Sequence, residues 1–203
     1  MRIALIGASG QAGSRILAEL ARRGHAVTAI ARDAGRIAAL PGVTPRAADL
    51  HDIPALAARL AGHDVAISSV HFTASDPEAL IGAVKQAGVA RYLVVGGAGS
   101  LEVAPGLKLF DTPDFPAIYR EEARRGGAFL ERLKQEALLD WTFLSPSAMF
   151  VPGERTGRFR LGADRLLLDA SGSSTISFED YAVALADEIE HPAHRRRRFT
   201  VGY

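Results

Sequence analysis

A strand-to-helix turn near the start of the chain carries three glycines at three-residue spacing, Gly7-Ala8-Ser9-Gly10-Gln11-Ala12-Gly13. It follows a short apolar run, Arg2–Ile6, and opens a segment from Gly10 to Arg23 whose apolar residues recur at helical spacing. Such a turn presents free backbone amides at the helix N-terminus, where the helix dipole favours an anion. The pattern therefore predicts a turn that binds the diphosphate of a dinucleotide. The alternative is a glycine-rich turn without a ligand.

The chain repeats this alternation of apolar runs and amphipathic segments. The runs predict further strands at Ala26–Ala31, Val43–Ala47, Asp64–Val70, Arg91–Val95, Trp141–Ser145 and Phe199–Val201. The amphipathic segments predict helices at Ile53–Leu60, at Asp76–Gln86, from Ala117 to Leu139 with a loosening at Gly126-Gly127, and from an N-cap at Ser177 to Glu190. Strands separated by helices form right-handed units of a parallel sheet. We expect an α/β protein with a Rossmann-type, doubly wound parallel sheet.

The length of 203 residues and the absence of an internal repeat predict a single domain over residues 1–203. Residues 151–175 are rich in Gly, Arg and Ser, so residues 151–203 are expected to contribute a small C-terminal appendage on the substrate side. About twenty residues after Gly96 read as a loop with three prolines. A loop of this length in a compact domain is usually functional.

The composition removes several classes of site. There is no cysteine, which excludes disulfides, thiolate metal ligands and cysteine nucleophiles. The six histidines show no metal-ligand spacing, so we expect no metal. The net charge of +1 gives no electrostatic case for nucleic acid or an anionic membrane as a partner.

Two segments could suggest other partners. The arginines of Arg195–Arg198 are expected to be solvated or paired with acids, because no nucleic-acid motif accompanies them. No apolar stretch approaches the ~20 residues of a membrane span. The first apolar run stops at Gly7, well short of a signal sequence, so we expect a cytoplasmic protein.

The residues that end the second expected strand, Ala31-Arg32-Asp33, bear on the choice of cofactor. An acidic residue ~20 positions beyond the glycines normally binds the adenosine ribose, whereas an arginine accommodates a 2′-phosphate. Arg32 comes first and would bind that phosphate, while Asp33 would cap the next short helix. We favour NADP(H) over NAD(H); NAD(H) is the alternative, because Asp33 has the ribose-binding spacing. Arg15 is a second candidate for the phosphate, or else a solvated residue of the helix.

Several strings resemble the atypical short-chain dehydrogenase/reductase family: Gly7–Gly13, Arg32-Asp33, Asp49-Leu50, Ser68-Ser69 and Ile176–Ala182. Two more, Val95–Leu101 and Pro152–Gly157, resemble a group within it that is provisionally named NADH-flavin reductases and is related to NmrA-like proteins and biliverdin-IXβ reductase. The resemblance covers nearly the whole chain. The glycine motif is shared by the whole superfamily, and the two later strings are more diagnostic of the group.

The resemblance implies roles for residues after three of the strands. Asp49 would lie near the adenine amino group, or else hold a loop, and Leu50 would pack on the adenine ring. Ser68, Ser69 and Val70 would pass the nicotinamide ribose. Pro146 would contact the carboxamide through backbone groups, or else simply end its strand.

The chain departs from the main dehydrogenase branch at the catalytic residues. That branch uses Tyr-x-x-x-Lys, in which the lysine lowers the pKa of the tyrosine. Tyr119 matches the tyrosine, but Ala123 stands four residues later. The hydroxyl expected just after the fifth strand is also missing, although Ser100 lies slightly later and could replace it. Tyr119 and Ser100 are thus the candidate catalytic residues, and the usual alcohol dehydrogenase mechanism is not expected.

A planar acceptor would need little acid–base help, because charge that develops on reduction is delocalised in its ring. The resemblance therefore implies an NAD(P)H-dependent reductase that transfers hydride to a flavin or quinone-like acceptor, acting as a monomer or homodimer. His71 and Phe72, just past the fourth strand, and Phe110 and Phe150 are the candidate substrate residues; core packing is the alternative for the rings. The rival functions are a non-catalytic NADP(H) sensor of the NmrA-like type and a relative of sugar-nucleotide epimerases or dehydratases.

Overall fold

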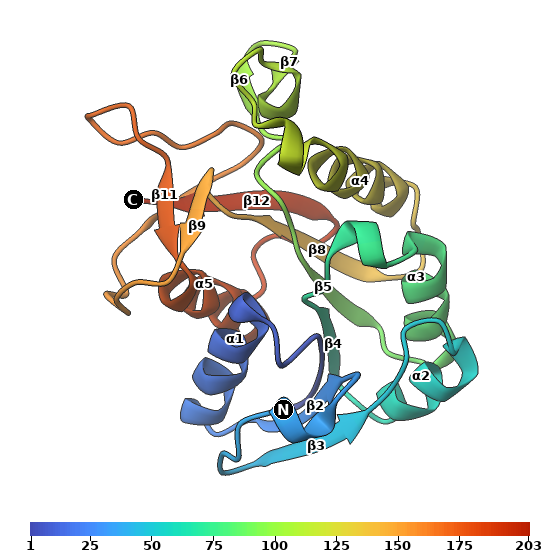
Figure 1. Cartoon of the computed structure of the whole chain (residues 1–203). Helices are drawn as coiled ribbons and strands as arrows, with labels where there is room; N and C mark the ends of the chain where they lie inside the picture. Colours follow the sequence, from blue (N-terminus) through green and yellow to red (C-terminus); the bar gives the residue numbers. More distant parts are fainter.

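The computed structural model describes all residues, 1–203, and is built around an eight-stranded sheet (Figure 1). The strand order is β10-β12-β8-β5-β4-β1-β2-β3. All neighbours in this order are parallel except β10 and β12. The strands are β1 (Arg2–Ile6), β2 (Ala26–Ala31), β3 (Val43–Ala47), β4 (Val65–Ser68), β5 (Arg91–Val95), β8 (Asp140–Ser145), β10 (Arg160–Gly162) and β12 (Arg197–Gly202). This sheet confirms the predicted Rossmann-type fold.

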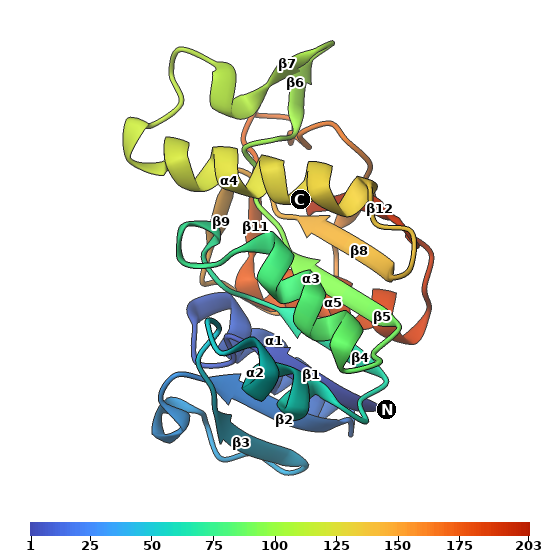
Figure 2. The ribbon, with the colours of Figure 1, turned by 90° about the vertical axis from the view of Figure 1, so that its right-hand side faces the viewer.

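Helices cover both faces of the sheet (Figures 1 and 2). One face carries α1 (Gln11–Arg22) and α5 (Phe178–Glu190), and the other carries α2 (Ile53–Leu60), α3 (Pro77–Gln86) and α4 (Ala117–Lys134). Successive side chains of β1 alternate between the two cores: Ile3 and Leu5 pack under α1 and α5, and Ala4 and Ile6 under the other three helices. A sheet covered on both faces requires apolar residues at nearly every strand position, as the sequence shows.

The helix starts follow from local capping. The side chains of Asp52, Asp76 and Ser177 accept hydrogen bonds from backbone amides in the first turns of α2, α3 and α5. Proline stands in the first turn of α2 and of α3, where its missing amide costs nothing. The predicted cap at Ser177 is thereby confirmed.

The predicted loosening of α4 at Gly126-Gly127 is wrong, because the helix is continuous from Ala117 to Lys134. Both glycines are buried and face aromatic rings. A Cβ at Gly126 would lie 2.9 Å from the ring of Phe72. The glycines therefore let α4 approach its neighbours closely. The helix also ends before the predicted Leu139, where the backbone turns and the Leu138 amide donates to the Glu136 carboxylate at 2.9 Å.

Two excursions leave the carboxyl edge of the sheet. After β5 the chain forms a projecting hairpin, β6 (Glu102–Ala104) with β7 (Leu107–Lys108), within the segment expected to be a loop. After β8 it forms β9 (Met149–Val151), which pairs with β11 (Thr175–Ser177). The irregular segment between them returns to the sheet through β10. None of the helices has the length and apolar character that a membrane span requires.

The opposite end of the sheet is the exposed edge strand β3. Its middle residue is Pro45, which lies opposite Ala29 of β2. Proline is tolerated there because an edge strand needs hydrogen-bond donors on one side only.

Candidate functional site

The candidate residues follow the carboxyl ends of β1, β2, β3, β4, β5 and β8. Because these strands are parallel, the segments that follow them lie at one edge of the sheet. Ligands of open parallel sheets bind at this edge, where the strand order reverses direction. Here the reversal lies between β1 and β4.

The glycines at the end of β1 are required by close backbone contacts. Gly7 has φ +83°, and a Cβ on it would lie 2.0 Å from the carbonyl oxygen of Ser69. A Cβ on Gly13 would lie 2.1 Å from the carbonyl oxygen of Gly7. The turn is therefore pressed against the start of α1 on one side and against the chain leaving β4 on the other.

The turn leaves backbone amides free at the N-terminus of α1. The amides of Gly7 and Ala8 donate to the Ile30 carbonyl at 2.8 and 3.1 Å. The amides of Gln11, Ala12 and Gly13 have no acceptor within the chain: the N-cap is Gly10, which has no side chain to accept them, and the first turn holds no acidic residue. Three convergent amides at the positive end of a helix dipole fit a diphosphate group.

Arg32 and Asp33, after β2, are both exposed but differ in their contacts. The Asp33 side chain accepts a hydrogen bond from the Gly35 amide at 2.9 Å and caps the short helix Ala34–Arg36, as predicted. Arg32 has no ion-pair partner in the chain. Arg15, the second candidate for a phosphate, pairs with Glu179 of α5 at 3.2 Å, and its guanidinium group lies over the ring of Phe178. Of the two arginines, Arg32 alone is unpaired.

Asp49 and Leu50, after β3, form part of a turn. The exposed Asp49 carboxylate accepts a hydrogen bond from the His51 amide at 2.9 Å. Leu50 is half-buried and packs against the core beneath α2. The structure therefore shows a loop contact for Asp49 and leaves its second carboxylate oxygen free for a ligand.

The three residues at the end of β4 have different surroundings. Ser68 is buried, and its hydroxyl shares a hydrogen bond of 2.8 Å with the Tyr92 hydroxyl. Ser69 and Val70 are half-buried and border Gly7, since a Cβ there would meet both. Of the predicted residues after β4, Ser69 and Val70 thus lie beside the glycine turn, and the Ser68 side chain points into the core.

Ser100, one of the two candidate catalytic residues, is only 5% exposed. Its hydroxyl accepts a hydrogen bond from the Arg198 guanidinium at 2.9 Å, and the same group donates to the Ser100 carbonyl at 3.0 Å. Arg198 of β12 also binds Asp164 at 2.6 Å. The Ser100 hydroxyl therefore links the loop after β5 to β12, which lies beyond β8 in the sheet.

Tyr119, the other candidate, lies in the first turn of α4 and is 59% exposed. Four residues later, Ala123 contacts the loop after β5, since a Cβ on Gly99 would lie 2.5 Å from the Ala123 Cβ. The chain after β5 therefore lies directly against α4 at Ala123, where a small side chain is needed.

A short helical turn, Phe72–Ala74, follows β4, and His71 directly precedes it. We call residues 71–74 the 71–74 turn. The His71 side chain is 84% exposed. The Phe72 ring is buried and packs against Phe129 and Phe143, with centroids 5.6 and 6.1 Å away. His71 is therefore available to a ligand, while the Phe72 ring is part of the core under α4.

The remaining predicted residues lie in the excursions or at the end of β8. Phe110 is half-buried and approaches Gly99 and Gly127. Phe150, on β9, packs against Phe178 and Tyr181 of α5, with centroids 4.5 and 4.7 Å away. Pro146 directly follows β8 and is buried.

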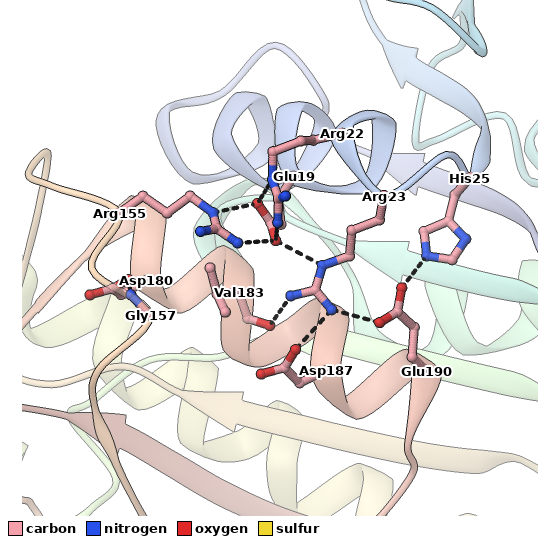
Figure 3. Close-up of polar contacts among 10 residues, drawn as sticks. All are labelled: Glu19, Arg22, Arg23, His25, Arg155, Gly157, Asp180, Val183, Asp187 and Glu190. Carbon is pink, nitrogen blue, oxygen red and sulfur yellow. Dashed lines mark hydrogen bonds and ion pairs between the residues drawn. The ribbon is translucent and has the colours of Figure 1, made fainter.

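A buried ion-pair network fixes α1, the helix with the free amides, to the rest of the molecule (Figure 3). Glu19, whose side chain is 4% exposed, accepts hydrogen bonds from Arg22, Arg23 and Arg155 at 2.7 to 3.0 Å. Burial alone would raise the pKa of Glu19, but the three guanidinium groups hold that pKa well below its usual range. The carboxylate is therefore charged at neutral pH.

Arg23 extends this network to α5. Its guanidinium binds Asp187 at 2.8 Å and Glu190 at 2.6 Å, and Glu190 also binds His25 at 2.9 Å (Figure 3). Burial alone would lower the pKa of Arg23, but the carboxylates around it raise that pKa above its usual value. We call the contacts of Glu19 and Arg23 the α1–α5 seam.

Two of the strings that carry the resemblance, Pro152–Gly157 and Ile176–Ala182, bind each other. The Asp180 carboxylate is fully buried and accepts from the Thr156 hydroxyl at 2.5 Å and the Gly157 amide at 2.7 Å. The Gly153 amide donates to Glu179 at 2.9 Å. Since Arg155 binds Glu19, the segment after β9 is tied to both α1 and α5.

Two of the four arginines of the basic run are paired with acids. Arg195 binds Asp140 at 2.5 Å, and Arg198 binds Asp164. No group of three His, Asp or Glu side chains is arranged to hold a metal ion.

A sequence profile for a family described as NAD(P)H-binding matches residues 7–192. The chain belongs to this NAD(P)H-binding family. The match begins at the first glycine of the turn and includes every site residue that the sequence predicts. It agrees with the free amides at the start of α1 and shows that the chain is an NAD(P)H-binding protein.

Relatives of this family member align over nearly their whole length. An uncharacterised Bacillus subtilis protein, YwnB, is 43% identical, and the alignment covers 99% of this chain and 98% of YwnB. A provisionally named exported protein from Burkholderia pseudomallei is 48% identical with a TM-score of 0.91, and both chains are covered completely. A provisionally named epimerase from Bacteroides thetaiotaomicron is 42% identical (TM-score 0.94, 100% and 96% covered). A provisionally named NADH-flavin reductase from Streptococcus pneumoniae is 35% identical (TM-score 0.84, 100% and 99% covered).

Sequence reasoning missed four residues that hold the site together: Glu122, Arg155, Asp180 and Arg198. Arg155 and Asp180 lie within two of the strings that carry the resemblance, Pro152–Gly157 and Ile176–Ala182. These strings mark the residues but do not indicate what their side chains bind. Glu122 follows Tyr119 by three residues on the expected helix, and Arg198 lies in the basic run. In each case the partner is more than twenty residues away, and local spacing cannot identify it.

Proposed function

We propose that the protein is an NAD(P)H-dependent reductase that transfers hydride to a flavin or quinone-like planar acceptor without a Tyr-x-x-x-Lys base. One observation carries the choice of acceptor: Ala123 packs against Gly99 where the branch with that base has its lysine. The ordinary pKa of a tyrosine hydroxyl is about 10, so a tyrosine without a lysine partner is a poor base at neutral pH. An acceptor that delocalises charge in a ring makes no demand for such a base.

The exposed apolar side chains suit an acceptor of this kind. Ile118 and Tyr119, after β5, are 81% and 59% exposed, and Met149 and Leu168, after β8, are 57% and 49% exposed. These segments leave the same edge of the sheet as the glycine turn. In this proposal His71 and Tyr119 contact the acceptor, and the rings of Phe72, Phe110 and Phe150 support the segments behind them.

Steady-state oxidation of NADPH and NADH with FMN, riboflavin and quinones tests the reaction. We expect turnover with at least one acceptor. Tight cofactor binding without turnover on any of them would contradict the proposal. It would favour the non-catalytic sensor, which should bind oxidised and reduced cofactor with very different affinities.

An epimerase function is the second candidate, because a relative 42% identical to this chain carries that provisional name. Epimerisation through a transient ketone requires a base, and Ala123 leaves Tyr119 without its lysine partner. Incubation with nucleotide sugars, followed by NMR of the products, distinguishes the two. Formation of the epimeric sugar would favour the epimerase, and its absence with flavin turnover favours the reductase.

For the cofactor we propose a preference for NADP(H) over NAD(H). Support comes from Arg32, which has no acidic partner, and from Asp33, which is engaged in capping. Arg32→Ala should weaken NADPH binding at least about tenfold more than NADH binding, because one charge-assisted hydrogen bond contributes about 1.5–3 kcal/mol. Arg59→Ala, an exposed arginine of α2, is the matched control. Equal loss for both cofactors, measured by calorimetry, would contradict the preference.

A further inference from the structure

The carboxylate of Glu122, on α4, binds the 71–74 turn after β4. One oxygen accepts a hydrogen bond from the Phe72 amide at 2.7 Å. The other accepts from the Thr73 amide at 2.9 Å and from the Thr73 hydroxyl at 2.7 Å. The His71 Nδ1 lies 3.4 Å from the first oxygen. One side chain thus holds three consecutive residues of the turn.

The turn is fixed from below by aromatic packing. The buried Phe72 ring lies against Phe129 and Phe143, and Gly126 of α4 leaves room for it. With its ring packed and its amide bound by Glu122, Phe72 has little freedom. His71, the preceding residue, is held at its backbone by this anchor while its imidazole is 84% exposed.

The turn also lies beside the cofactor half of the site. Only Val70 separates His71 from Ser69, whose carbonyl oxygen lies against Gly7. On α4, Tyr119 precedes Glu122 by three residues, so the two lie on neighbouring positions of one helix face. The carboxylate that holds the turn of His71 therefore lies on the same face of α4 as Tyr119. Both His71 and Tyr119 are exposed.

We propose that Glu122 is a positioning residue of the acceptor half of the site: it holds the 71–74 turn so that the His71 imidazolium, with its Nδ1 proton toward Glu122, donates a hydrogen bond through Nε2 to a carbonyl oxygen of the planar acceptor. The inference rests on the proposed reductase function and deepens it. Flavins and quinones both present carbonyl oxygens in the ring plane, which an imidazole N–H can bind. Because Nδ1 faces Glu122, Nε2 is the nitrogen that is left for the acceptor.

Glu122→Gln tests this role, because glutamine keeps the size of the side chain but places an NH2 group where one acceptor oxygen stood. Glu121→Gln is the matched control, since Glu121 is exposed and pairs only with Arg125 on the same helix. Hydrogen exchange of the Phe72 and Thr73 amides is the readout that needs no turnover. We expect exchange at least about tenfold faster in Glu122→Gln and unchanged in Glu121→Gln.

Kinetics and a double mutant test the functional part. Glu122→Gln and His71→Ala should each raise the KM for the acceptor about tenfold while cofactor affinity stays unchanged. In the His71→Ala background, Glu122→Gln should add little further effect, because both act on one contact. Unchanged amide exchange, or fully additive kinetic effects, would overturn the inference. A wild-type protein that reduces no acceptor would refute the proposed reductase instead, and the exchange measurement would still decide whether Glu122 holds the turn.

Discussion

Helices α1 and α4 border the two halves of the candidate site, and different chemistry holds each of them in place. α1, which carries the free amides, is bound through the buried carboxylate of Glu19 and the guanidinium of Arg23. α4, beside the acceptor half, packs its two glycines closely against the rings of Phe72 and Phe110. A buried group of charges is stable only when every charge keeps its partner. The close contact at the glycines of α4 instead depends on there being no larger side chain in that space.

The difference teaches where each helix can tolerate change. At the α1–α5 seam, loss of one charge leaves others buried without a counter-charge. At α4, addition of a single methyl group meets a ring that is already packed on both sides. The four predictions that follow test these two kinds of sensitivity.

Glu19→Gln should have the largest effect on stability. The carboxylate pairs with three guanidinium groups, and its loss leaves Arg23 buried with one partner fewer. Because Arg22 and Arg155 are partly exposed, we expect a loss of about 3 kcal/mol in the free energy of unfolding, at the lower end of values for broken buried pairs. Urea denaturation at pH 7 measures this loss. The exposed Glu121→Gln should change stability by less than about 0.5 kcal/mol.

The effect of Glu19→Gln should also depend on pH. The pKa of Glu19 in the folded protein is lowered below its unfolded value of about 4.5, so its stabilising contribution is complete above that pH. As the pH falls below about 4.5, the unfolded chain takes up the proton first, and the contribution declines. The stability difference between wild type and variant should therefore shrink on acidification. A difference that stays constant from pH 7 to pH 3 would show that the charge of Glu19 is not its source.

Gly126→Ala should have an intermediate effect. Its Cβ would lie 2.9 Å from the Phe72 ring, which is packed against Phe129 and Phe143 and cannot move aside. We expect a net loss of about 1–2 kcal/mol, because overpacking outweighs the higher helix propensity of alanine. Gly82→Ala in α3 is the control, since nothing lies within 4 Å of its Cβ position. That variant should gain up to about 1 kcal/mol. Equal effects in thermal unfolding would remove the special role of Gly126.

Gly127→Ala should have the smallest effect. Its Cβ would lie 3.2 Å from the Phe110 ring, which is half-buried and free to shift by a few tenths of an ångström. The cost of that shift and the gain in helix propensity should nearly cancel, to within about 0.5 kcal/mol. A loss as large as that of Gly126→Ala would mean that Phe110 is as firmly held as Phe72.

The sequence predicted the sheet and the glycine turn after β1 because both depend on local patterns. The glycine spacing after β1 and the capping by Asp33 and Ser177 involve residues close in the chain, and the structure has both. The acceptor half depends on contacts between distant segments. Glu122 binds a turn fifty residues earlier, and Ser100 binds Arg198 almost one hundred residues later. Periodicity and spacing carry no information about such pairs.

One wrong structural expectation, the loosening at Gly126-Gly127, has the same origin. Two adjacent glycines inside a helix pattern lower its propensity, and local reasoning can only interpret them as a weak point. The reason for their presence is two aromatic rings: Gly126 faces Phe72, from the turn after β4, and Gly127 faces Phe110, from the segment after β5. Glycine in a helix therefore indicated a close neighbour that the sequence could not identify.

Pro45, in the middle of the edge strand β3, has a consequence for how molecules meet each other. An unpaired strand edge is a template on which another chain can add its own strand and begin to aggregate. A proline there withholds one amide donor from that template. At the opposite end of the sheet, the short antiparallel strand β10 covers β12. Both flanks of the sheet are thereby made less receptive to a foreign strand, and the carboxyl edge stays accessible to small molecules.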